Sequence, residues 1–422
     1  MLVIAICTLV LLIMINIYIY KSYSYPPVVF TMVWVINLSG LLLAGNLFYP
    51  ISVETLLVYI VGAMSFSIGG IVQVLLVRGE INYYTPITDT HKELVKRIIN
   101  ICLVILIIAI PIYWGKMQEL ALSSSINNYW GAIRQLSIQR HDETITSISI
   151  IDNLVPFSII IAWLSCNELD GSNFSKVRAV VAFVLASFYT IFTGARSGIL
   201  ILLIVPVSMI AIRNRRFPWK LAIVMFFLVI LSFSFIAIQR ELAFKTSELS
   251  LVEGVAIALE HLGLYAFGGS VAFDSIVNNT NSIPSIRGIL WVFIIIANKF
   301  GAGIDMPLSN AEFTMVSSSF TTNVYTVYFG YFSDYGWFGV ILGMLFQGFV
   351  ITWIYRIAMR KNSQAVVVYS VFFYAMLKSG FNDEFFEGLN LLIKLMVAIF
   401  MLYRFPRMFP KYSNENYIVT NR

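Results

Sequence analysis

The chain has 422 residues, of which 59% are hydrophobic and only 12% carry a charge. This composition excludes a water-soluble protein, which needs a polar surface, and it predicts an integral membrane protein. The net charge of +6 is not evidence for a nucleic-acid partner, and we expect none, because charge on a membrane protein must first be assigned to one side of the bilayer.

Apolar runs long enough to cross a bilayer recur along almost the whole chain. A bilayer core of about 30 Å requires roughly 20 apolar residues per helix. The first run lacks a basic segment before it and a small-residue cleavage site after it, so we expect a retained helix rather than a signal peptide. We predict an all-α polytopic membrane protein with about eleven transmembrane helices in a single domain, residues 1–422. The predicted spans are 2–20, 28–48, 53–77, 98–115, 150–166, 178–193, 197–213, 221–239, 336–355, 364–380 and 388–403.

Basic residues in short loops indicate the orientation of these spans. Four groups of such residues begin at Arg78, Lys176, Arg213 and Arg356. Positive charge in short loops marks the inner side of the membrane. These four groups lie on the same side only if all eleven spans are counted. We therefore expect the N-terminus outside and the C-terminus inside. Two longer segments, 116–149 and 240–335, then lie outside. The second contains ILWVFIIIANKF, whose apolar run is too short to span, so we expect this loop to carry interfacial helices.

Arginines on the outer face are candidates for binding an anion. An arginine keeps its charge and offers planar donors that match phosphate oxygens. Arg196 lies in IFTGARSGIL, a tight hairpin where the next helix would add free N–H groups and the positive end of its dipole. Arg240 at the outer end of the eighth span, Arg287 in the long loop and Arg134 in the earlier outer segment are further candidates. Each is equally compatible with a snorkelling side chain or a local ion pair.

The outer acid–base candidates are three carboxylates and one histidine. Asp334 lies where the aromatic-rich segment YFGYFSDYGWFGVIL enters the ninth span, so partial desolvation would suit it to general-base work, although it could instead cap the helix. His261 lies in the long loop, and Asp383 and Glu384 lie in FNDEFFEG, a short outer turn where they could simply be solvated. No spacing of possible ligands indicates a metal, so we expect a metal-independent site without a cofactor.

Four segments together resemble a known family. They are FTGARSGIL (192–200), AIQREL (237–242), LYAFGGSVAFDSI (264–276) and TTNVYTVYFGYFSDYGWFGV (321–340). This pattern, with many spans and a long outer loop late in the chain, resembles the Wzy-type O-antigen polymerases, also described as oligosaccharide repeat-unit polymerases. The last segment is the most specific of the four.

The resemblance implies a GT-C-like glycosyltransferase of the Gram-negative inner membrane whose active site faces the periplasm. Such an enzyme transfers a growing glycan from undecaprenyl diphosphate to the non-reducing end of an incoming lipid-linked repeat unit. Arg196, Arg240 and Arg287 would then hold the diphosphate, and a carboxylate or histidine would deprotonate the acceptor hydroxyl. We also expect Tyr265 and Tyr325, which lie in two of the segments, to contact the substrate. The implied partners are undecaprenyl-diphosphate-linked oligosaccharide, membrane lipids and a polysaccharide chain-length regulator.

Three other functions stay open from the sequence. A lipid-linked oligosaccharide flippase or other transporter would also need cations around an anionic lipid, but it should carry charges within its spans and pseudo-symmetric halves. Of the basic residues, only Lys378 and Lys394 lie clearly within predicted spans, and both lie late in the chain. An O-antigen ligase would have a similar architecture and nearly the same chemistry. A non-catalytic membrane subunit would leave the outer arginines unexplained.

Overall fold

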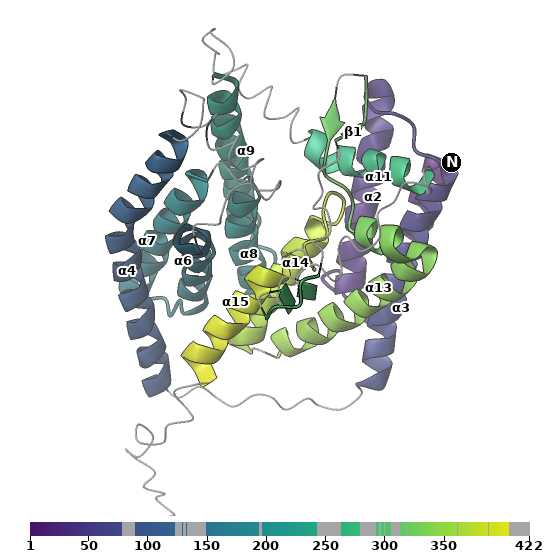
Figure 1. Ribbon diagram of the computed structural model, residues 1–422. Helices are drawn as coiled ribbons and strands as arrows, with labels where there is room; N and C mark the ends of the chain where they lie inside the picture. The colour runs from purple at the N-terminus through teal and green to yellow at the C-terminus, as the bar shows by residue number, and fades with distance from the viewer. Residues whose placement is uncertain are drawn as a thin grey trace, which may run out of the picture.

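The computed structural model describes most of the chain. The described residues are 1–77, 89–122, 129, 132, 149–193, 196–242, 263–278, 293–294, 297–298, 300–304, 313–318, 320–360, 362–386 and 388–404. Over these residues the protein is almost entirely helical, with a single antiparallel pair of two-residue strands (Figure 1).

Within the described residues, eleven longer helices form the body of the protein. They are α1 (Leu2–Tyr20), α2 (Pro26–Ala44), α3 (Val53–Leu76), α4 (Asp89–Leu122), α6 (Ser149–Asn167), α7 (Asn173–Ile191), α8 (Arg196–Asn214), α9 (Trp219–Leu242), α13 (Tyr328–Ala358), α14 (Ser363–Leu377) and α15 (Leu389–Ile399). The smaller elements are η1 (Gly45–Leu47), η2 (Leu264–Gly268), α11 (Gly269–Asn278), β1 (Thr314–Met315), β2 (Thr321–Thr322) and η4 (Phe400–Arg404).

The length and composition of these helices identify a membrane protein. Within the described residues, α1, α2, α3, α4, α7, α8 and α13 are long and apolar enough to cross a membrane, and α6, α9, α14 and α15 contain shorter apolar stretches. Each of the eleven predicted spans coincides with one of these helices. The all-α membrane class is confirmed, whereas a crossing by the four shorter helices and the GT-C-like architecture stay predictions.

The helices form two groups with α14 and α15 between them (Figure 1). In one group α13 packs along α3, and α1 and α2 cover α3. In the other group α4, α6, α7, α8 and α9 pack on one another. Helix α14 contacts α8 and α6 of the second group and α2 and α13 of the first. Helix α14 therefore lies where both groups meet.

Glycines bring α3 and α13 into backbone contact. A Cβ added at Gly69 of α3 would collide with the carbonyl oxygen of Leu345, and a Cβ added at Gly348 of α13 would collide with that of Phe66. Small residues at such a crossing let two helices approach closely, which is how helices associate in a membrane without a hydrophobic driving force between them. This crossing fixes the position of α13.

Helix α13 is broken at Gly336, where φ is 58°. This left-handed conformation is readily adopted by glycine, and it falls where the ninth span is predicted to begin. The first part of the helix, 328–335, turns back onto the second. A Cβ at Gly339 or Gly343 would collide with the backbone or ring of Tyr331. Because of this break, Tyr331 packs against the second part of α13.

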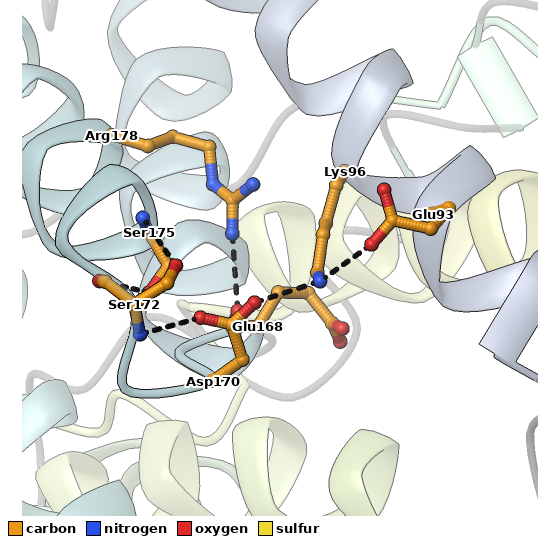
Figure 2. A network of polar contacts seen from close by, with 7 residues as sticks. All are labelled: Glu93, Lys96, Glu168, Asp170, Ser172, Ser175 and Arg178. Atoms are coloured by element: carbon orange, nitrogen blue, oxygen red, sulfur yellow. Dashed lines mark hydrogen bonds and ion pairs between the residues drawn. The ribbon is translucent and has the colours of Figure 1, made fainter.

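A network of charged residues ties the start of α4 to the turn between α6 and α7 (Figure 2). Lys96 Nζ lies 2.8 Å from an Asp170 oxygen, and Arg178 donates a hydrogen bond of 3.1 Å to the Glu168 carbonyl. The hydrogen bonds from Lys96 and then from Ser172 hold the pKa of Asp170 well below its usual range. The Asp170 carboxylate therefore stays ionised, and the Lys96 contact persists, at neutral pH.

The same end of the bundle gathers other basic helix termini. Arg213 at the end of α8 donates to the side chain and backbone of Asn167, and Arg356 near the end of α13 donates to the Val77 carbonyl over 2.9 Å. We call the end that carries Lys96, Arg178, Arg213 and Arg356 the basic end, and the opposite end the distal end. The structure therefore groups at one end the basic residues that the sequence predicts to share one side.

Candidate functional site

A buried ion pair lies at the distal end of α14. Lys378 follows the last residue of this helix, and its ammonium contacts the Glu384 carboxylate, with side chains only 8% and 17% exposed. The ammonium also lies 5.3 Å from the ring centroid of Phe381, and Asn382 donates to the same Glu384 oxygen over 3.3 Å. The turn after α14 therefore holds a cation and a carboxylate that are both largely withdrawn from water.

Asp383 in the same turn is also buried. One of its oxygens accepts hydrogen bonds from the backbone N–H groups of Phe385 and Phe386, over 3.1 and 3.4 Å, and lies 3.5 Å from the Gln347 amide nitrogen. Gln347 in turn contacts the hydroxyl of Tyr331. The interpretation of Asp383 and Glu384 as simply solvated is wrong, because α13 covers the turn that carries them.

The start of α8 lies close to this turn. The Tyr374 hydroxyl of α14 donates to the Ser197 carbonyl over 3.4 Å, and Tyr374 precedes Lys378 by one helical turn. A Cβ added at Gly198 would lie 2.6 Å from the Thr190 methyl group, so α8 starts tightly against the end of α7, as the hairpin prediction requires. Arg196 is the first residue of α8. Its backbone is thus one residue from the contact with α14.

The segment 264–276 packs on the other side of the turn. Asn37 of α2 donates to the Ala266 carbonyl over 2.5 Å and accepts a hydrogen bond of 2.8 Å from the Ser270 hydroxyl. A Cβ added at Gly269 would lie 2.9 Å from the Gly380 carbonyl oxygen. This glycine lets α11 approach the turn backbone directly.

The segment 321–340, which includes the start of α13, also contacts the turn after α14. The Val327 N–H donates to the Ser379 carbonyl over 2.8 Å. Tyr325 is buried, with its ring stacked on Phe329 at 4.4 Å and its hydroxyl 2.8 Å from that of Thr314 in β1. These contacts join the strand pair to α13, and the predicted contact between Tyr325 and the substrate stays a prediction.

Asp274 anchors α11 to the start of α3. One Asp274 oxygen accepts hydrogen bonds from the Ser52 N–H and hydroxyl, over 2.8 and 2.6 Å, and Ser52 caps α3. Asp274→Ala leaves these donors without their acceptor, so we expect a loss of about 1–3 kcal/mol in stability, seen as a lower melting temperature of the detergent-purified protein. Asp274→Asn, which keeps an acceptor oxygen, should lose much less. Equal melting temperatures for wild type and Asp274→Ala would contradict this role.

The remaining predicted site residues are described to different extents. Asp334 is half-buried on the first part of α13. The backbones of Arg196, Arg240 and Tyr265 are described, but not their side chains; His261, Arg134 and Arg287 lie outside the described residues. Across the described part of the chain no group of three histidine, cysteine or acidic residues could hold a metal, and metal independence stays a prediction.

The sequence interpretation did not include Lys378, Tyr374 or Gln347 among the site residues. The available signal was Lys378 itself, because a lysine at the end of an apolar run is costly unless a nearby acid pairs with it. Segments 264–276 and 321–340 contact the turn formed by 378–386, and segment 192–200 contacts α14 at Tyr374, four residues before Lys378. No family model, curated protein or solved structure matches this chain, so its activity has to be inferred from its own residues.

Proposed function

We propose that the protein polymerises lipid-linked oligosaccharide repeat units at the periplasmic face of a Gram-negative inner membrane. It would transfer the growing glycan from undecaprenyl diphosphate to the non-reducing end of a new repeat unit, which builds O-antigen or a similar surface polysaccharide. One observation carries the proposal. Two segments that resemble the Wzy-type polymerases, 264–276 and 321–340, contact one turn that contains a buried lysine and two withdrawn carboxylates, and a third, 192–200, contacts the helix that leads into this turn.

The chemistry of this transfer fits the residues of the turn. As the bond between sugar and phosphate breaks, the electron pair leaves with the lipid diphosphate, whose negative charge must be stabilised. Arg196 begins α8, and Lys378 lies one helical turn beyond the contact between α14 and α8. A guanidinium and an ammonium in a region of low dielectric would stabilise this leaving group more strongly than they would in water.

The acceptor hydroxyl must lose a proton to a general base. Asp383 already accepts two backbone N–H groups, so it holds the turn in shape. Glu384 lies in the same turn, and Lys378 and Asn382 both contact the same one of its oxygens. Glu384 is therefore the favoured base among the described carboxylates, with Asp334 and His261 as the other candidates.

Deletion of the gene in its source bacterium tests the proposed function. A polymerase deletion should reduce the ladder of surface polysaccharide on a gel to lipid A core with a single repeat unit. The wild-type gene on a plasmid should restore the full ladder. Complete loss of repeat units from the core would instead indicate a ligase or a flippase, and an unchanged ladder would exclude all three functions.

A further inference from the structure

The burial of the ion pair between Lys378 and Glu384 makes a purely structural role unfavourable. Helix α14 has 15 residues, which is about 22 Å at the usual rise, against a hydrocarbon core of about 30 Å. If α14 crosses the membrane from the basic end, its length leaves Lys378 short of the distal membrane surface. At such a site the desolvation of two charges often exceeds their attraction, so an apolar pair of similar size would stabilise the fold as well or better.

Within the described part of the chain, the charge of Lys378 is balanced by one carboxylate. Among the described residues its carboxylate partner is Glu384. The other neighbours on this side are the rings of Phe381 and Tyr374, with centroids 5.3 and 5.8 Å from the ammonium. Aromatic faces attract a cation but do not neutralise it. An anion that takes the place of this carboxylate on the ammonium would displace Glu384.

The contact between α14 and α8 brings the start of α8 to the same place. Tyr374 and Lys378 are four residues apart on α14 and share a face, and the Tyr374 hydroxyl contacts the Ser197 carbonyl. The first N–H groups of α8 have no partner within the helix. A diphosphate beside the start of α8 would thus be within a helical turn of the Lys378 ammonium.

We propose that Lys378 is a phosphate-binding cation and that Glu384 is its counter-ion only while the site is empty, so that an entering lipid diphosphate displaces Glu384 from the ammonium. This inference rests on the proposed function for the identity of the anion. The exchange keeps the buried ammonium neutralised throughout, and it releases the Glu384 carboxylate only when the diphosphate is bound. Glu384 would therefore be available to the acceptor hydroxyl in the loaded site and not in the empty one.

Binding of undecaprenyl diphosphate to the full chain in lipid nanodiscs tests the exchange. Glu384→Gln removes the competing carboxylate, so its Kd for this lipid should be about tenfold lower than that of the wild type. The double variant Lys378→Met with Glu384→Gln removes both charges together, which avoids an unpaired buried charge, and it should lose this gain. Undecaprenol, which lacks the diphosphate, should bind all three proteins equally.

A matched control is available on the surface of α4. Lys116 and Glu119 form an exposed ion pair with side chains 50% and 69% exposed, and Glu119→Gln should leave the Kd for undecaprenyl diphosphate unchanged. An unchanged or higher Kd in Glu384→Gln would overturn the exchange, since a purely structural pair gives no tighter binding when it is broken. A normal glycan ladder in the deletion strain would contradict the proposed polymerase but not the exchange, which is measured without glycan.

Discussion

Replacing Arg196 with alanine is expected to abolish glycan elongation without changing the amount of protein in the membrane. Arg196 is the first residue of α8, so its loss removes a charge at the start of the helix. Loss of a group that stabilises a leaving diphosphate should lower the rate about a hundredfold or more. The measurement is the surface polysaccharide ladder of a deletion strain that expresses the variant, with an immunoblot of its membranes.

Two further substitutions sharpen this test. Arg196→Lys should also fail in large part, because an ammonium does not offer the planar pair of donors that a guanidinium gives to phosphate. Arg216→Ala serves as the control, since Arg216 is an exposed arginine in the turn after α8, at the basic end. Long glycan of normal length in the Arg196→Ala strain would show that the diphosphate is held elsewhere.

The helices and their common basic end could be predicted from the sequence for simple physical reasons. Apolar length decides which segments cross a bilayer, and each predicted span coincides with a helix. Charge in short loops decides which ends belong together. Lys96 contacts Asp170, and Arg213 contacts Asn167. Both contacts join helix ends that the basic residues alone assign to the same side.

The candidate site was harder to predict because its geometry depends on contacts across the sequence. The ion pair joins Lys378 to a residue six positions later across a turn, which follows no helical period. Asp383 is buried because Gln347, 36 residues earlier, packs over it, and the break at Gly336 brings Tyr331 beside Gln347. A solvated turn was therefore the natural interpretation of FNDEFFEG in isolation.

One of the resembling segments, 264–276, serves packing through two of its polar side chains. In LYAFGGSVAFDSI, the Ser270 hydroxyl bonds to Asn37 and the Asp274 carboxylate bonds to Ser52. Both side chains hold α11 against α2 and α3 and are already engaged within the protein. A sequence pattern alone does not separate such positioning residues from those that touch a substrate, whereas the hydrogen bonds do.

Replacing Gly348 with alanine is expected to cause the largest loss of stability among the single substitutions considered. The added methyl group would collide with the Phe66 carbonyl of α3, and a helix backbone cannot move aside as a flexible side chain can. We expect a loss of about 1–3 kcal/mol or more, despite the roughly 1 kcal/mol by which alanine favours a helix over glycine. The melting temperature of the purified protein in detergent measures this loss.

Gly115 provides the matched control for Gly348. It lies within α4, and a Cβ added there would meet nothing within 4 Å. Gly115→Ala should therefore keep or slightly raise the melting temperature, because only the helix propensity changes. If Gly348→Ala melts at or above the temperature of Gly115→Ala, then α3 and α13 are not in backbone contact. The position of Tyr331, and with it the cover over Asp383, would then have to be revised, because α13 carries both Tyr331 and Gln347 to the site.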